Sequence, residues 1–149
     1  MNRILIATDG SPGGCQAVRL GLALAATTDA EATILYVRKP PHGIIGDAYY
    51  QRALTATFAP ARQVIHDALA SADEMDVDAE GEIMEGDAAE QIVELARSRD
   101  VDMIVVGSRA LGPFAATLLG SVSQAVVHGA DRPVLVVTAH HPEERRAAA

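Results

Sequence analysis

The sequence predicts a doubly wound α/β fold, with a five-stranded parallel sheet in the order 3-2-1-4-5 and helices on both faces. Five short apolar segments alternate along the chain with four segments of helical spacing. This alternation is typical of parallel sheets built by right-handed crossovers. The chain has 149 residues, which suits a single compact domain. Its aromatic content is only 3%, so we expect a core of Ala, Val, Leu and Ile.

The first strand and helix are marked by a change of hydrophobic period. Residues 3–9 form an apolar run that ends in an acid, as expected for a parallel strand buried on both faces. Ser11 and Pro12 then supply an N-cap and a first-turn proline for a helix that continues to Thr28. Residues 32–37 repeat the strand pattern and form the second strand.

The middle of the chain is less regular. Residues 44–58 mix a glycine, the pair Tyr49-Tyr50 and small side chains, and this composition predicts a mobile loop ahead of a second helix that ends near Met75. Residues 77–84 alternate acids with small or apolar residues. Such a pattern favours an edge strand whose charges prevent pairing with another molecule.

A third helix and two further strands complete the pattern. Asp87 and Glu90 form a variant of the capping box, and the helix that they open is expected to end near Asp100. The remaining strands are residues 102–107 and 133–137, and the last helix spans residues 120–129.

The acidic strand decides between two common strand orders. One order would place it beside the first strand, near the centre of the sheet, where its alternating charges disfavour burial. We therefore expect the order 3-2-1-4-5, with the fourth strand beside the first. The turns after Asp9 and Gly107 then flank the crevice at the carboxyl ends of the strands, where ligands bind in such sheets.

The negative net charge of the chain excludes some classes of binding partner. The formal net charge is −8, so nucleic acid and anionic membranes are repelled and neither is expected to bind. The acids gather between Asp73 and Asp87, a run interpreted as a solvated face, with a docking patch for a basic partner as the alternative. The sequence has no long apolar run or signal-peptide pattern, and Cys15 is its only cysteine, so we expect a cytoplasmic location.

The segment that follows the fourth strand is the strongest candidate site. A loop that enters a helix at Gly120-Ser121 presents backbone N–H groups and the positive helix end, which together favour a phosphate. Ser121 and Ser123 add hydroxyl donors, and Gly107 lets the backbone approach the ligand. The alternative is that these glycines only turn the chain. A P-loop is excluded, because proline and phenylalanine stand where lysine and Ser/Thr must follow the second glycine.

Four stretches of the chain resemble the universal stress protein family. They read Ala-Thr-Asp-Gly-Ser at residues 7–11, Ile-Val-Val-Gly-Ser-Arg at 104–109, Leu-Leu-Gly-Ser-Val-Ser at 118–123 and Arg-Pro-Val-Leu-Val-Val at 132–137. The resemblance covers nearly the whole chain, in order and with similar spacing. It implies the 3-2-1-4-5 sheet, dimerisation through the final strand and, in one branch of the family, bound ATP.

The ATP-binding branch is marked by a glycine, two residues, a second glycine, nine residues, a third glycine and Ser or Thr. Gly107, Gly120 and Ser121 match this spacing, but Ala110 replaces the second glycine, with Gly112 two residues later. If that position requires a left-handed backbone, alanine costs about 1 kcal/mol. Tenfold weaker binding corresponds to about 1.4 kcal/mol. We therefore expect this departure to weaken an ATP site without abolishing it.

The resemblance also implies which residues contact the nucleotide. Arg109 is the nearest cation of the loop, either as a phosphate contact or as a solvent-facing side chain. Because protein and nucleotide are both negative, Mg²⁺ is expected as a bridge. The other implied contacts are Asp9 and the Val37 backbone at the base, Gly107 and Ala110 along the ribose and phosphates, and Gly120, Ser121, Val122 and Ser123 at the phosphates.

The last strand predicts an oligomer. An apolar strand at a sheet edge leaves backbone groups unpaired and invites a symmetric partner, so we expect a homodimer. The domain is expected to span residues 1–138, and residues 139–149 are expected to form a flexible tail. The edge residues that would pair are Val134, Leu135, Val136 and Val137.

The leading functional hypothesis is an ATP-responsive switch, in which the occupied loop sets the affinity for an unknown regulatory protein partner. A nucleotide-independent dimeric interaction protein is the first alternative, favoured by Ala110 and Pro113. A slow ATPase is the second. The sequence pairs no serine nucleophile with a His/Asp base and spaces no histidines as metal ligands, so we assign no catalytic residue and no metal site.

Overall fold

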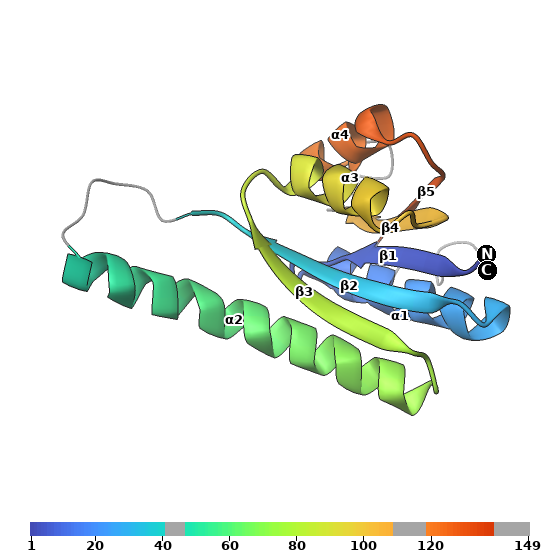
Figure 1. Ribbon diagram of the computed structural model, residues 1–149, viewed down its shortest axis with the longest axis horizontal. Coiled ribbons are helices and arrows are strands. Elements are labelled where there is room, and N and C mark those ends of the chain that lie inside the picture. Colours follow the sequence, from blue (N-terminus) through green and yellow to red (C-terminus); the bar gives the residue numbers. More distant parts are fainter. Residues whose placement is uncertain (41–46, 109–118, 139–149) are drawn as a thin grey trace, which may run out of the picture.

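The computed structural model describes residues 1–40, 47–108 and 119–138, in which five strands alternate with four helices (Figure 1). The strands form one parallel sheet in the order β3-β2-β1-β4-β5, so the predicted fold class and strand order are confirmed. The elements are β1 (Arg3–Ala7), α1 (Pro12–Thr28), β2 (Glu31–Arg38), α2 (Asp47–Glu74), β3 (Ala79–Glu85), α3 (Ala88–Ser98), β4 (Met103–Ser108), α4 (Ser121–Gly129) and β5 (Val134–Thr138).

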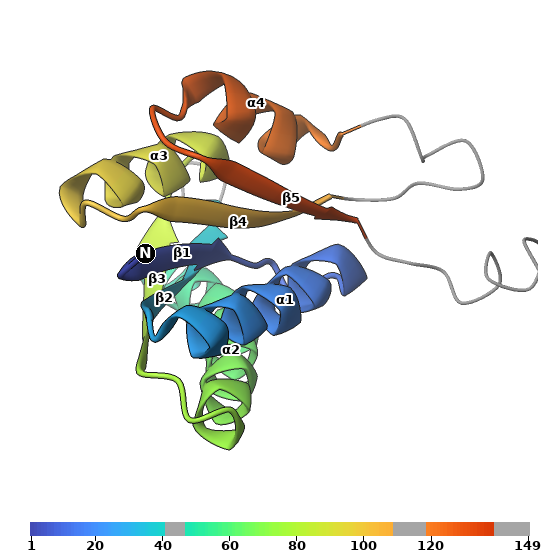
Figure 2. The same ribbon diagram turned by 90° about the vertical axis from the view of Figure 1, so that its right-hand side faces the viewer.

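The sheet separates two apolar layers. Helices α1 and α2 cover one face, and α3 and α4 cover the other (Figure 2). Because side chains alternate along a strand, β1 serves both layers. Ile4 and Ile6 pack against the α1 and α2 side, whereas Leu5 and Ala7 pack against the α3 and α4 side. β1 is therefore the central strand of the core.

The parallel register aligns the carboxyl ends of the three central strands. Ile6 of β1 pairs with Ile34 of β2 on one side and with Val105 of β4 on the other. The loops that leave β1, β2 and β4 consequently emerge at the same edge of the sheet. The first turns of the helices that follow β1, β3 and the 109–118 segment lie at this edge as well.

The prediction of a mobile loop over residues 44–58 is wrong for its described part. α2 begins at Asp47 and continues without interruption through Pro60, and only residues 44–46 lie outside the described residues. The second half of α2 is anchored in the core through Ile65, Ala68 and Ala72. Once a helix is nucleated, each added residue gains a backbone hydrogen bond, so the anchored half extends through the irregular composition that precedes it.

Of the eight acids between Asp73 and Asp87, seven are exposed, which agrees with the interpretation of this run as a solvated face. β3 does lie at the edge of the sheet, as predicted. However, three of its carboxylates are in ion pairs: Glu80 and Glu82 both contact the Arg99 guanidinium, and Glu85 contacts Arg38. Arg99 directly follows α3 and Arg38 ends β2, and both are distant in sequence from the acids, so the sequence alone could not reveal these pairs.

Candidate functional site

A cavity of about 230 Å³ lies at the carboxyl edge of the sheet, where the three central strands end. Its lining combines strand ends with helix starts, which is the arrangement that places ligands in open α/β sheets. The strand ends contribute Ala7, Thr8, Asp9, Leu35, Val37, Lys39, Val106 and Gly107, and the helices and the turns before them contribute Ser11, Gly14, Gly86, Ala88, Ile92, Gly120, Ser121, Val122 and Ser123.

Seven of the nine predicted site residues line this one cavity. They are Asp9, Val37, Gly107, Gly120, Ser121, Val122 and Ser123. The other two, Arg109 and Ala110, lie outside the described residues. The cavity thus brings together segments that are more than a hundred residues apart in the chain, and their role as nucleotide contacts stays a prediction.

The turn after β1 is held by its own side chains. The Thr8 hydroxyl oxygen accepts a hydrogen bond from Gly10 N at 3.2 Å, and Asp9 Oδ1 accepts one from Ser11 N at 3.0 Å. A Cβ on Gly14 would lie only 2.8 Å from both Asp9 Oδ1 and Thr8 Oγ1. Glycine at position 14 therefore lets this turn lie directly against the start of α1.

Gly107 lies where β4 comes closest to α1. A Cβ at this position would lie 2.4 Å from the backbone carbon and oxygen of Gly13 and 2.7 Å from Gly14 N. A Cβ on Gly13 would in turn lie 2.4 Å from Ser108 O. Gly107 does line the cavity, but the contact that excludes a side chain there is the close approach of β4 to α1. Packing against α1 therefore favours glycine here, and a contact of Gly107 with a ligand stays a prediction.

Three helix N-termini reach the cavity, and two of them are capped by side chains. The Ser11 hydroxyl oxygen accepts a hydrogen bond from Gly14 N in the first turn of α1, at 3.2 Å. Asp87 Oδ1 does the same for Glu90 N in α3, at 3.0 Å. Both caps were predicted and are confirmed. They occupy amide groups that would otherwise be available to an anion.

The N-terminus of α4 differs from the other two. Its N-cap residue is Gly120, which has no side chain and makes no side-chain cap hydrogen bond. The first-turn N–H groups of a helix have no acceptor within the helix, so here they remain available to an external acceptor. Gly120 has φ −60° and ψ 157°, an extended conformation that other residues also adopt. The backbone geometry therefore does not by itself require glycine.

The two serines of this turn are not equivalent. Ser123 is buried, and its hydroxyl donates to Gly120 O at 2.9 Å. Its hydrogen therefore has an acceptor within the turn, and its predicted role as a hydroxyl donor to phosphate stays a prediction. Ser121 is exposed, and no other described residue forms a hydrogen bond with its hydroxyl. Ser121 is the serine of this turn that can donate to a ligand.

Lys39 is a lining residue that the sequence analysis missed. It lies directly after β2, two positions beyond Val37, and it is the only lysine of the chain. The predicted strand order offered a signal, because any charged residue just past the second strand falls at the carboxyl edge. The loop motif drew attention to Arg109 instead, which belongs to another part of the sequence.

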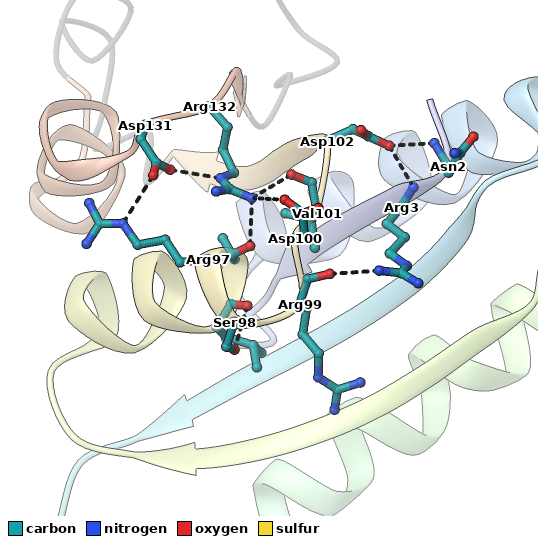
Figure 3. A network of polar contacts seen from close by, with 12 residues as sticks. Asn2, Arg3, Arg97, Ser98, Arg99, Asp100, Val101, Asp102, Asp131 and Arg132 are labelled. Atoms are coloured by element: carbon teal, nitrogen blue, oxygen red, sulfur yellow. Dashed lines mark hydrogen bonds and ion pairs between the residues drawn. The ribbon is translucent and has the colours of Figure 1, made fainter.

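The opposite edge of the sheet has a different chemistry (Figure 3). Two hollows of about 410 and 480 Å³ lie there, lined mainly by charged side chains that include Arg3, Glu31 and Asp102. Hydrogen bonds from the backbone N–H groups of Asn2 and Arg3, at 2.5 and 3.0 Å, lower the pKa of the Asp102 carboxyl. No helix of the described residues begins at this edge, so the first-turn amide groups that reach the smaller cavity have no counterpart among them here.

The fold and the cavity together define a class of protein: a doubly wound α/β domain with a cavity at the switch point of its sheet. The model of the universal stress protein family matches residues 1–138, and the chain therefore belongs to this family. Among the helices that the described residues form, none combines the length and apolarity needed to cross a bilayer.

Relatives and solved structures agree with this assignment. A universal stress protein of Thermus aquaticus is 33% identical over 134 residues, which cover 90% of this chain and 96% of that protein. The structure of the universal stress protein UspA from Lactobacillus plantarum has a TM-score of 0.80 at 23% identity, over 91% of this chain and 97% of that one. A universal stress protein in complex with cAMP has a TM-score of 0.72 at 26% identity, over 93% and 98%.

Proposed function

We propose that this protein is a nucleotide-binding regulatory switch, that ATP occupies the cavity at the carboxyl edge, and that the occupied state sets the affinity for a protein partner. The observation that carries the proposal is the start of α4. It is the helix N-terminus at the cavity without a side-chain cap, and it lies beside the ends of β1, β2 and β4. Free amide groups and the helix dipole favour a phosphate at this place.

The lining residues outside the α4 turn suit the base and the sugar of a nucleotide. Leu35, Val37, Ile92 and Val106 give the cavity apolar walls, and Asp9 and Ser121 add an acceptor and a donor. Apolar walls with a few directed polar groups are typical of cofactor sites. A solved relative with 26% identity was crystallised with cAMP, which supports a nucleotide as the ligand class. The choice of ATP rests on the Gly107, Gly120 and Ser121 spacing.

A cation is a separate part of the proposal. Asp9 is the one carboxylate among the described residues that line the cavity. Mg²⁺ commonly takes one or two carboxylates together with substrate phosphates and water, so Asp9 could serve as its protein ligand. Titrations with ATP in the presence and absence of Mg²⁺ test this point separately from nucleotide binding.

The Gly120→Val variant tests the nucleotide site. Because Gly120 has an extended backbone, valine is compatible with the local conformation, while its side chain is expected to hinder approach to the α4 amide groups. We expect ATP affinity, measured by calorimetric titration of nucleotide-stripped protein, to fall at least about tenfold, which corresponds to about 1.4 kcal/mol.

Gly129→Ala provides a matched control at the other end of the same helix. A Cβ on Gly129 would lie 3.6 Å from Val93 Cγ2, an ordinary contact, so this variant should fold and bind like the wild type. Equal ATP affinity in both variants and the wild type would argue against the α4 site. Absence of binding at millimolar ATP would favour the nucleotide-independent interaction protein.

We also propose that the protein forms a homodimer through β5. β5 lies at the edge of the sheet, and its register with β4 shows which groups face outward. Ile104 N donates to Pro133 O at 2.9 Å, so residues 133, 135 and 137 point their backbone groups at β4. Val134 and Val136 then direct theirs toward the open edge, where a second copy could pair with them.

Val136→Pro tests the dimer, because proline removes an outward N–H group without removing a bond to β4. Val136→Ala is the matched control, since it shortens the side chain and keeps the N–H group. We expect light scattering after size exclusion to report a dimer for the wild type and for Val136→Ala, and a large monomer fraction for Val136→Pro. A monomeric wild type would rule out the proposed dimer.

A further inference from the structure

Lys39 gives the cavity a positive charge that the family motif does not account for. The chain carries a net charge of −8 and a single lysine. Among the described residues that line the cavity, Lys39 is the one cation and Asp9 the one carboxylate. The α4 amide groups attract an anion through partial charges, whereas Lys39 adds a full charge.

The backbone that carries Lys39 is held by its neighbour. Arg38 is 9% exposed, and its guanidinium forms an ion pair with Glu85 and stacks over the Phe58 ring, 4.0 Å from the ring centroid. The Arg38 carbonyl oxygen accepts a hydrogen bond from Gly86 N at 3.0 Å. These contacts tie the end of β2 to the end of β3 and to α2. They keep the Cα atom of Lys39 at the rim of the cavity.

One of these contacts also holds a second residue of the rim, Gly86, in place. Gly86 lines the cavity beside Lys39, and its φ of +142° favours glycine over residues with side chains. The Gln91 side chain lies next to Gly86, with its Nε2 atom 3.3 Å from where a Cβ would be. Lys39 is exposed, and its backbone is held at the rim of the cavity.

We infer that Lys39 is a specificity-determining residue of this site, and that its ammonium group makes affinity rise with the negative charge of the nucleotide. The inference rests on the proposed function and goes beyond it, since the α4 turn alone would bind a phosphate with little regard to the total charge of the ligand. A charge-assisted contact from a lysine to a phosphate is worth about tenfold in affinity. Because Lys39 is exposed, salt should weaken its contribution.

The test compares Lys39→Met and Lys39→Arg with the wild type, using ATP, AMP and adenosine as ligands at low and at high salt. We expect Lys39→Met to weaken ATP binding about tenfold, to weaken AMP binding less and to leave adenosine binding unchanged. The salt dependence of ATP affinity should also decrease. Lys39→Arg should retain most of the preference for ATP.

Arg62→Met is the matched control for net charge. Arg62 is exposed on α2 and does not line the cavity, so this variant loses the same charge without changing the site. ATP affinity that is equal in Lys39→Met and the wild type would overturn the inference while leaving the proposed function intact. An equal loss for ATP and adenosine would overturn it too, because it would indicate a steric role. A wild type that binds none of the three ligands would overturn both proposals.

Discussion

At the two edges of the sheet, backbone polar groups differ in the partners that they have. At the amino edge, charged side chains satisfy backbone groups of the protein itself: the Arg132 guanidinium donates to Ala96 O and Val101 O, both at 2.8 Å (Figure 3). At the carboxyl edge, Gly120 leaves the first turn of α4 without a side-chain cap. A helix end with a local partner adds stability, whereas one without a partner is available to a ligand. The two edges therefore differ in whether such groups have partners within the protein, and the proposed nucleotide site lies at the edge with the uncapped helix.

The largest expected effect tests the packing beneath the carboxyl edge. In Gly107→Ala the new methyl group would lie 2.4 Å from backbone atoms of Gly13, which cannot rotate away as a side chain would. We expect a loss of about 3 kcal/mol in the free energy of unfolding, measured with denaturant. Wild-type stability in Gly107→Ala would contradict the packing role, and the predicted contact with a ligand would remain.

The next effect tests the amino edge. Arg132 is 15% exposed, and Arg132→Met would remove the guanidinium donor from both carbonyl oxygens. Ala96 O would keep the Val101 N–H group as a donor, at 3.1 Å, whereas Val101 O would lose its side-chain partner. We expect a loss of about 2 kcal/mol in the free energy of unfolding. Nucleotide affinity at a temperature where the variant is folded should not change. A change in affinity with unaltered stability would contradict this difference between the two edges.

The smallest effect is a pH dependence at the same edge. Hydrogen bonds from the Asn2 and Arg3 backbone lower the pKa of Asp102 in the folded state. The unfolded state therefore takes up the proton first as the pH falls, so this stabilisation is present above the ordinary carboxyl pKa and is lost as the pH falls through the lowered value. In Asp102→Asn, thermal unfolding midpoints should be lower than in the wild type at neutral pH, and the difference should shrink as the pH falls below the ordinary carboxyl value of about 4.

Asp73→Asn provides the control for that measurement. Asp73 is exposed near the end of α2, and its side chain makes no hydrogen bond to another described residue. This variant removes the same charge without removing a backbone contact. A midpoint difference that stays constant between neutral and acidic pH in Asp102→Asn would show that the Asp102 contacts contribute nothing through ionisation.

Secondary structure was predicted correctly from the sequence where it depends on residues close together in the chain. Continuous apolar runs predicted the strands, and Ser11 and Asp87 predicted two helix starts, because a cap acts on an amide only three residues away. The alternating acids of β3 predicted an edge position. Prediction failed at the start of α2, where packing of distant residues such as Ile65 and Ala68 against the sheet stabilises a helix that local composition disfavours.

In the candidate site, too, some features could be predicted from the sequence and others could not. Seven of its predicted residues could be proposed from a motif and from the rule that ligands bind at the carboxyl ends of parallel strands. The motif could not show that Ser123 donates to Gly120 O, since a hydroxyl can rotate between a ligand and its own turn. Lys39 escaped notice because no pattern in the sequence links it to the residues of the α4 turn.

The strand order, the edge at which a ligand site would lie and the family of the protein could all be predicted from the amino-acid sequence. They follow from the spacing of apolar residues, from cap residues and from motif spacing, which can be read along the chain. Only the tertiary structure decided that Gly107 accommodates α1, that Arg99 pairs with the β3 acids and that Lys39 lies at the cavity. The physical reason is that close approach and ion pairing depend on distances between elements, which the chain sets only when all of them are packed together.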